Sequence, residues 1–395
     1  MARYVILSEI RFTERDWQRF GCAEFAAAGY EIMPVEVGRA LGQGAGAGAR
    51  GRFRTMEGVI VTATLDELER LLAQLKKNDV VLLEARLSKV TRPLFRLLKR
   101  HRVAYAAVDL GLLPLTRLRS KRAALSLAEY LELRWEDIRG ALHRVRRLLS
   151  EMTADGFDYF RLQPPWLWLT AGTAALACAS RLPRAWTARR VAVSSFDQMT
   201  ANTLRDRPVE SRGTAVFLDE AFPDHPDFEI LGLRSPVTAE RYWPSIERLF
   251  RAVEAKTGLR VVVAPHPKTS GTVPDPIRVR MAEVGRTAEL VRESALVLSH
   301  VSTAVSFAVL FRRPLLFVTT DEIERSSYRG AVARMSSWFG LRRVNADRFE
   351  PAELVPQPVS EALYRAYEHA FLRSPDAADR SPWEILRAEA EGRAA

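Results

Sequence analysis

Short apolar runs alternate with amphipathic stretches along most of the chain, and this alternation predicts strands and helices in turn. In the first half, apolar runs predict strands at residues 4–7, 30–37, 79–83, 103–108 and 191–193. Helical spacing predicts helices at residues 14–28, 65–77 and 135–152, with a basic helix between the third and fourth strands. Residues 41–51 are rich in Gly and Ala, so they are predicted to form a flexible loop.

The same alternation restarts in the second half of the chain. Strands are predicted at residues 214–218, 260–264, 296–299 and 315–318, and helices at residues 239–257, 287–293, 303–311 and 361–372. Strands that alternate with helices form parallel sheets through right-handed crossovers. We therefore expect an α/β fold of two Rossmann-like domains that face each other across a cleft.

A polar stretch at residues 197–213, which contains Pro208 and Gly213, is the expected linker. It divides a first Rossmann-like domain at residues 1–196 from a second at 214–350, and helices are expected over residues 351–395. Residues 162–180 carry no charge, but Gln163, two prolines and Gly172 interrupt them and their length is at the short limit for a membrane span. A buried loop and helix is the interpretation that we favour there.

The composition predicts a folded chain, with 47% hydrophobic and 27% charged residues. The net charge of +11 is uneven, because residues 1–190 carry +12 and the remainder carries −1. Three basic sets account for much of this: Arg86, Lys89, Arg92, Arg96, Lys99, Arg100 and Arg102; Arg117, Arg119, Lys121 and Arg122; and Arg144, Arg146 and Arg147. Leucines interleave with the first set, which suits a helix that faces an anionic membrane surface or polymer. A solvated helix face packed through its leucines fits the same pattern.

Targeting and binding motifs narrow the class of protein further. The apolar run at the N-terminus is too short for a signal peptide, so we expect a cytoplasmic protein, with the basic half able to hold it peripherally on the inner face of the plasma membrane. Cys22 and Cys178 suggest no disulfide framework. No recognised nucleic-acid motif occurs, so nucleic acid is not an expected partner. Neither a G-x-G-x-x-G loop nor a Walker motif is present, which disfavours nicotinamide and ATP enzymes, and no cofactor is expected.

Two polar clusters follow β-branched runs in the second half. Residues 264–268 read Ala-Pro-His-Pro-Lys, and residues 299–304 read Ser-His-Val-Ser-Thr-Ala. We expect both at the carboxyl ends of neighbouring strands, the edge at which open α/β sheets bind ligands. The second cluster offers hydroxyls and backbone N–H groups at a predicted helix start, a combination that binds anions. Together they predict a site for a phosphate-bearing nucleotide.

Acidic residues follow two other predicted strands. Asp219 and Glu220 open a loop that places four carboxylates and His225 within nine residues, and Asp109 ends a strand of the first half. These groups could supply a base, a metal site or a ribose clamp, and helix caps or turns are the alternative. No Asp-x-Asp occurs, so no metal is expected. Glu9, at the end of the first strand, is a candidate for acceptor binding.

The His266–Pro267 and Ser302–Thr303 pairs, with the helix-and-strand unit that follows them, resemble two motifs of GT-B glycosyltransferases of the bacterial sialyltransferase and polysialyltransferase type. Teichoic-acid polymerases that use CDP-glycerol are similar in outline. The resemblance covers residues 214–320 and extends to the first half only in outline. It implies that His266 binds the donor phosphate and protonates it as it leaves. It also implies that Ser302 and Thr303 hydrogen-bond the same phosphate and that Lys268 adds charge. Pro267, Asp219 and His225 are further candidates for substrate binding, and His300 either contacts the ligand or is buried behind the strand.

The resemblance implies a transferase that moves a sugar from a nucleotide-activated donor, with a CMP-sugar favoured, to a saccharide or lipid-linked saccharide. Cell-surface polysaccharide or lipopolysaccharide synthesis is the expected context. The first domain would hold the acceptor and the second the donor. Such families hold their base with an acidic pair followed by Gly, where this chain has Ala221, so Glu220 and Asp109 both remain candidates. A UDP-sugar transferase, a sugar-nucleotide 2-epimerase and a non-catalytic scaffold of a polysaccharide assembly complex are the alternatives.

Overall fold

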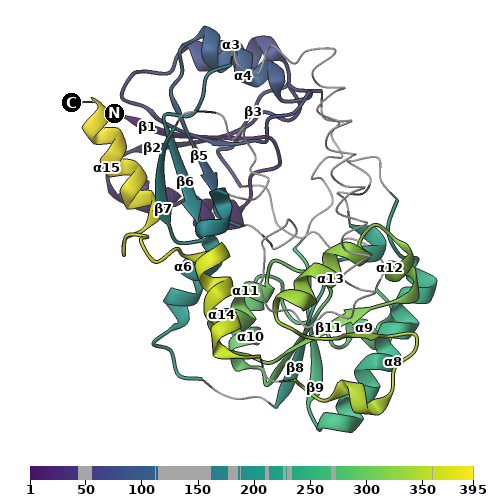
Figure 1. Ribbon diagram of the computed structural model, residues 1–395. Coiled ribbons are helices and arrows are strands. Elements are labelled where there is room, and N and C mark those ends of the chain that lie inside the picture. The colour runs from purple at the N-terminus through teal and green to yellow at the C-terminus, as the bar shows by residue number, and fades with distance from the viewer. Residues whose placement is uncertain are drawn as a thin grey trace.

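The computed structural model divides the chain into two α/β domains, each built around a parallel sheet (Figure 1). The structure describes residues 1–42, 56–111, 113, 162–176, 186, 188–209, 213–225, 228, 234–267, 273–357 and 359–394. The predicted helix at residues 135–152, the second and third basic sets, Cys178 and most of the Gly- and Ala-rich loop lie outside these residues.

The N-terminal domain has a seven-stranded sheet with the order β3-β2-β1-β4-β5-β6-β7. Its strands are β1 (Arg3–Ser8), β2 (Glu31–Glu36), β3 (Ile60–Val61), β4 (Val80–Glu84), β5 (Tyr105–Asp109), β6 (Leu167–Ala171) and β7 (Arg189–Val193). The inner strands β4, β5 and β6 are buried along their whole length. Burial on both faces explains why their sequences are continuous apolar runs rather than alternating ones.

Helices cover both faces of this sheet. They are α1 (Glu14–Arg19), α2 (Cys22–Ala27), α3 (Leu65–Ala73) and α4 (Arg92–Arg100). The single helix predicted at residues 14–28 is therefore wrong, because the chain turns at Gly21 with a φ of +64°. Glycine is required at this turn, since a Cβ there would overlap the ring of Trp383, 2.1 Å from its nearest atom.

The C-terminal domain has a five-stranded sheet with the order β12-β11-β10-β8-β9. Its strands are β8 (Thr214–Leu218), β9 (Arg260–Ala264), β10 (Leu296–Ser299), β11 (Leu315–Thr319) and β12 (Arg343–Asn345). Helices α8 (Ala239–Thr257), α9 (Asp275–Arg278), α10 (Thr287–Glu293), α11 (Val305–Leu310), α12 (Asp321–Arg325) and α13 (Arg329–Trp338) belong to this domain. The expectation that β9 and β10 are neighbours is wrong, because β8 lies between them and pairs with both.

The last residues of the chain join both domains. Helix α14 (Glu361–Tyr367) and the π-helical segment η5 (Glu368–Leu372) contribute Tyr364, Tyr367 and Phe371 to the core of the C-terminal domain. Helix α15 (Pro382–Ala394) instead places Trp383 in the core of the N-terminal domain. Figure 1 shows α15 in yellow beside the N-terminal sheet, with the two chain ends close together.

Two segments differ from the predicted pattern. Residues 162–180, predicted as a buried loop and helix, contain strand β6 followed by the short 3-10 helix η2 (Thr173–Leu176). The expected linker at residues 197–213 begins inside helix α6 (Phe196–Leu204), whose N-cap Ser195 accepts a hydrogen bond from the backbone of Gln198. Among the residues that the structure describes, no helix is long and apolar enough to cross a membrane.

An ion pair at the amino end of the N-terminal sheet leads to a stability prediction. The Asp79 carboxylate is fully buried and accepts hydrogen bonds from Nε of Arg3 at 3.0 Å and from the backbone N–H of Lys76 at 2.7 Å. Burial alone would raise the pKa of Asp79, but these hydrogen bonds outweigh it, so the pKa lies below its ordinary value.

We expect Asp79→Asn to lower the free energy of unfolding at pH 7 by about 1.5–3 kcal/mol, the usual range for hydrogen bonds to a charged group. Because the folded pKa is depressed, this stabilisation is present above the unfolded pKa of about 3.9 and is lost as the pH falls through the folded value. Denaturant unfolding at pH 7 and pH 3 measures both effects. Asp275→Asn is the control, since Asp275 forms an exposed pair with Arg278 and should cost little. An equal loss for the two variants would contradict the prediction.

Candidate functional site

Three loops meet at the carboxyl edge of the C-terminal sheet, after strands β8, β9 and β10. Asp219, from the loop after β8, the strand that lies between β9 and β10, connects two of them. One of its carboxylate oxygens accepts a hydrogen bond from the backbone N–H of His266 at 3.3 Å, and the other accepts one from Ala221 at 2.8 Å. Asp219 is buried, whereas His266 is partly exposed. The carboxylate therefore fixes the His266 backbone and leaves its imidazole at the surface of the site.

The imidazoles of His225 and His266 lie side by side at this edge. Their ring centroids are 4.7 Å apart, and both residues are partly exposed. His225 follows the short 3-10 helix η3 (Phe222–Asp224), which begins after Ala221 in a left-handed conformation. The sequence placed both histidines in one site, and the structure brings them together. Pro267 is partly exposed beside His266, and Lys268 lies outside the described residues.

The Glu220 carboxyl group is inserted beneath the loop that follows β10. Its Oε1 atom accepts backbone hydrogen bonds from His300 at 3.2 Å and from Val301 at 2.7 Å. Burial raises the pKa of Glu220 to about 8, and the neighbouring Asp219 adds to the effect, while the backbone N–H groups oppose it. Glu220 is thus committed to backbone groups of the same domain.

His300 is a buried residue of the core rather than a surface group. Its side chain is inaccessible, with Nδ1 2.8 Å from the carbonyl oxygen of Val318 and Nε2 2.9 Å from the hydroxyl of Tyr242. Burial lowers the pKa of His300 to about 4, so the ring is neutral and its Nδ1–H donates to the carbonyl. Of the two interpretations open for His300, the structure supports burial behind the strand and gives no route to a ligand.

The expected anion site at the start of a helix takes a different form. Helix α11 begins at Val305 rather than residue 303 and has only six residues. The N–H groups of His300 and Val301 donate to Glu220, and that of Ala304 donates to the Ser302 hydroxyl at 3.2 Å. These three backbone donors already have acceptors within the chain, so the expectation that they are free N–H groups is wrong. Ser302 is partly exposed and Thr303 is exposed, which leaves their side chains as the polar groups at the tip of the loop.

Asp109 and Glu9 lie at the carboxyl edge of the other sheet. Asp109 ends β5, is buried, and accepts a hydrogen bond from the Trp168 indole N–H at 3.1 Å. Glu9 follows β1 and accepts one from the backbone N–H of Arg86 at 3.3 Å. Among the described residues, no cluster of three or more metal-binding side chains occurs at either edge or elsewhere.

Helix α6 contacts segments that follow the carboxyl ends of strands in both sheets. Its first residue, Phe196, donates its backbone N–H to the carbonyl oxygen of Leu110, directly after β5, at 3.3 Å. The helix also packs on α11, which follows β10. Burial raises the pKa of Asp197. The charge of Arg19 and a hydrogen bond with Ser306 of α11 oppose this increase. The sequence did not predict the contacts of α6 with both domains, because residues 197–213 resemble an ordinary polar linker. It also did not predict the hydrogen bond from Tyr242 to the His300 ring, because a single aromatic residue on a helix face has no distinguishing pattern.

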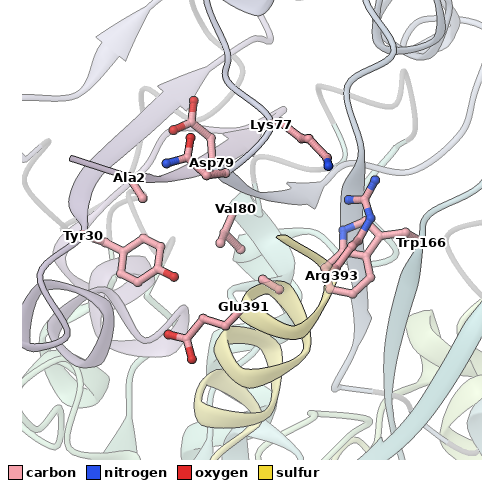
Figure 2. A pocket seen from close by; sticks show the side chains of 10 residues that line it. Ala2, Tyr30, Lys77, Asp79, Val80, Trp166, Glu391 and Arg393 are labelled. Atoms are coloured by element: carbon pink, nitrogen blue, oxygen red, sulfur yellow. The ribbon is translucent and has the colours of Figure 1, made fainter. Parts of the chain in front are cut away.

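A hollow lies at the amino end of the N-terminal sheet, opposite the edge that holds Asp109 and Glu9. Figure 2 shows Tyr30, Lys77, Trp166 and the α15 residues Glu391 and Arg393 around it. The Arg393 guanidinium covers the Trp166 ring at 5.3 Å from its centroid. This hollow lies at the amino ends of β1 and β4, whereas ligands of open α/β sheets bind at the carboxyl ends. The carboxyl edge of the C-terminal sheet is therefore the better candidate.

Comparisons with known proteins bear on the fold. No protein-family model and no curated protein match the sequence. The structure of the wall teichoic acid polymerase TagF superimposes with a TM-score of 0.51 at 10% identity, over 99% of this chain and 88% of that one. UDP-GlcNAc 2-epimerase from Methanocaldococcus jannaschii, in complex with UDP-GlcNAc and UDP, gives 0.46 at 12% identity, over 99% and 100%. The similarity to TagF, with the two parallel sheets, confirms the predicted architecture of two Rossmann-like domains of the GT-B type.

Proposed function

We propose that the chain is a glycosyltransferase that moves a sugar from a nucleotide-activated donor to a saccharide or lipid-linked saccharide acceptor. One observation carries the proposal: the loops after β9 and β10 present His266, Ser302 and Thr303 at one carboxyl edge of a GT-B-type fold. An imidazole and two hydroxyls are groups that can donate hydrogen bonds to a phosphate. A CMP-sugar is the favoured donor, and assembly of surface polysaccharide is the proposed context.

The residues then have separate roles in a displacement at the anomeric carbon. The acceptor oxygen forms a bond to that carbon, and the bond to the leaving phosphate oxygen breaks with its electron pair. His266 protonates the leaving phosphate, a task that suits an imidazole because it ionises near neutral pH. Ser302 and Thr303 hydrogen-bond the same phosphate. We assign proton removal from the acceptor hydroxyl to Asp109, which ends β5 at the carboxyl edge of the domain proposed to hold the acceptor, whereas Glu220 holds backbone N–H groups of the donor domain.

A panel of nucleotides tests this function. CMP, CDP, UDP and GDP are each added to the full chain, and the thermal midpoint is measured. A ligand that binds only the native state raises the midpoint, because it stabilises that state by RT ln(1 + L/Kd), where L is the concentration of free ligand. We expect selective stabilisation by a cytidine nucleotide, followed by release of that nucleotide from the corresponding sugar donor. A chain that binds a nucleotide but never releases it from any donor would instead be a binding protein.

The hydroxyls of Ser302 and Thr303 are expected to contribute to nucleotide affinity. The double variant Ser302→Ala, Thr303→Val should weaken binding by about 1.5–3 kcal/mol, the range for hydrogen bonds to a charged group. Titration calorimetry with the selected nucleotide measures the change. Thr200→Val with Thr203→Val is the matched control, because those hydroxyls bond only carbonyls of their own helix α6. Unchanged affinity in the Ser302, Thr303 double variant would place the phosphate elsewhere.

The structure limits which basic residues of α4 could face an anionic membrane surface. Arg92 of α4 is buried and cannot face a membrane, while Arg96, Lys99 and Arg100 are exposed. Arg100 also pairs with Glu69 of α3 at 2.9 Å. Basic residues near an anionic surface contribute roughly 1 kcal/mol each, and salt screens them.

If these three residues attach the protein to anionic lipid, changing all three to Glu should abolish sedimentation with phosphatidylglycerol vesicles in low salt. Wild-type protein should sediment with these vesicles and should be released by high salt. Nucleotide binding, measured in parallel, should be the same in both proteins. Wild-type protein that ignores the vesicles even at low salt would remove the membrane from the proposal.

A further inference from the structure

The Glu220 carboxyl group lies where two strands of the C-terminal sheet bring their loops together. We infer that Glu220 is a positioning residue, whose buried carboxyl group holds the loop after β10 in the shape that receives the donor phosphate. The inference rests on the proposed function for the identity of the ligand. It assigns Glu220 a role other than the catalytic base.

The geometry of the carboxyl group supports a positioning role. A single oxygen, Oε1, accepts the N–H groups of both His300 and Val301, at 3.2 and 2.7 Å, and the Ser302 N–H also faces the carboxyl group. Residues 300 and 301 are buried and Ser302 is partly exposed, so the contact lies on the inner side of the loop. Without this acceptor, two buried N–H groups would be unpaired, which costs about 1–3 kcal/mol for each group.

The rest of the loop is anchored from other directions. The His300 ring is held between the Val318 carbonyl of β11 and the Tyr242 hydroxyl of α8. The Ser299 hydroxyl accepts the N–H of Ser302 at 3.3 Å. These contacts fix the base of the loop, and Ser302 and Thr303 supply the polar side chains that reach the surface. Among these anchors, Glu220 is the carboxylic acid.

Its charge state matters because a phosphate binds within two residues of its hydrogen-bond partners. The groups that face Glu220 are Asp219 on its own loop, the backbone N–H groups of the β10 loop and Tyr242 on α8. Burial raises the pKa of Glu220 to about 8, so at neutral pH the carboxyl group is mostly protonated. Oε1 accepts both N–H groups in either state. Ionisation above pH 8 would place a buried negative charge next to the bound phosphate and weaken its binding.

Two variants separate the hydrogen bonds from the charge. Glu220→Gln keeps an oxygen that accepts both N–H groups and removes the titration, whereas Glu220→Ala removes both. Hydrogen exchange of the backbone N–H groups of residues 300–302 measures the loop directly, without any ligand. The Kd of the nucleotide selected in the panel is measured from pH 6.5 to pH 9.5 for wild type and both variants.

We expect protected N–H groups in wild type and Glu220→Gln and faster exchange in Glu220→Ala. At pH 7, the Kd of Glu220→Gln should lie within about threefold of wild type, and that of Glu220→Ala should rise at least tenfold, about 1.4 kcal/mol. Wild-type affinity should fall above pH 8, while that of Glu220→Gln should be much flatter. Unchanged exchange in Glu220→Ala, or a Gln variant as impaired as the Ala variant, would overturn the inference.

The outcomes also distinguish this inference from the proposed function. If wild type binds no nucleotide, the proposed function fails, and hydrogen exchange still decides whether Glu220 holds the loop. If wild type binds nucleotide with the same pH dependence as Glu220→Gln, the function stands and the role of the Glu220 charge is overturned. If Glu220→Ala does not fold, the comparison of wild type with Glu220→Gln across pH remains decisive.

Discussion

Replacing His266 with alanine is expected to lower the turnover of the sugar donor by about 10²–10⁴-fold, the usual contribution of general acid–base catalysis. The imidazole lies at the carboxyl edge of the C-terminal sheet, partly exposed, and in the proposed reaction it protonates the leaving phosphate. The backbone N–H that anchors this residue to Asp219 is retained in the variant. The loss should therefore appear in kcat, with little change in stability.

Steady-state kinetics with the donor identified by the nucleotide panel measures this loss. His101→Ala is the control, because His101 lies at the end of α4, next to the amino end of β5 and away from the carboxyl edge that holds Asp109, and its ring contacts Glu69. A thermal midpoint within a few degrees of wild type shows that His266→Ala is folded. Wild-type turnover in a folded His266→Ala protein would remove the imidazole from the mechanism.

Replacing Gly172 with alanine is expected to destabilise the chain by roughly 3–5 kcal/mol, at the upper end for single substitutions. Gly172 follows β6 with a φ of +69°, a conformation that L residues rarely adopt. A Cβ there would lie 2.3 Å from the carbonyl oxygen of Ala370 and 2.5 Å from the backbone nitrogen of Phe371. Both neighbours are backbone atoms of η5, so the contact between β6 and the C-terminal segment would have to open.

Gly29→Ala provides the matched control for this effect. Gly29 has a φ of +84°, but a Cβ there would have no atom within 4 Å. Gly29→Ala should therefore lower the free energy of unfolding only by the cost of the left-handed backbone conformation, about 1–2 kcal/mol. Denaturant unfolding of the two variants separates backbone strain from the close approach of η5. Equal losses would show that the contact between Gly172 and η5 contributes nothing to stability.

Much of the fold could be predicted from local sequence, and the exceptions have physical reasons. The C-terminal strands β8, β9 and β10 lie at the predicted residues, because short β-branched runs between turn residues have few alternatives. Strand β6 was missed because its Leu- and Trp-rich run fits a strand and a buried helix equally well. The break at Gly21 was missed because apolar spacing continues across it and the reason for the turn, the Trp383 ring, lies in the last helix.

The candidate site was predictable only in part. Residue type and position after a strand placed His266 and Ser302 at the correct sheet edge. The order of the strands could not be derived, so the contact between Glu220 after β8 and the N–H groups after β10 was not foreseen. Because of that contact, the N–H groups of His300 and Val301, which were expected to be free, donate to the Glu220 carboxyl group instead. His300 was ambiguous for a similar reason, because the Val318 and Tyr242 groups that satisfy its ring are distant in sequence.

The crystal structure of the full chain with the nucleotide selected by the panel tests the central claim most directly. The account predicts a phosphate within hydrogen-bond distance of the Ser302 and Thr303 hydroxyls and of the His266 imidazole, with Glu220 still bonded to the N–H groups of His300 and Val301. A nucleotide bound with its phosphate at the N-terminal sheet or in the hollow beside Trp166, with the loops after β9 and β10 uncontacted, would contradict it.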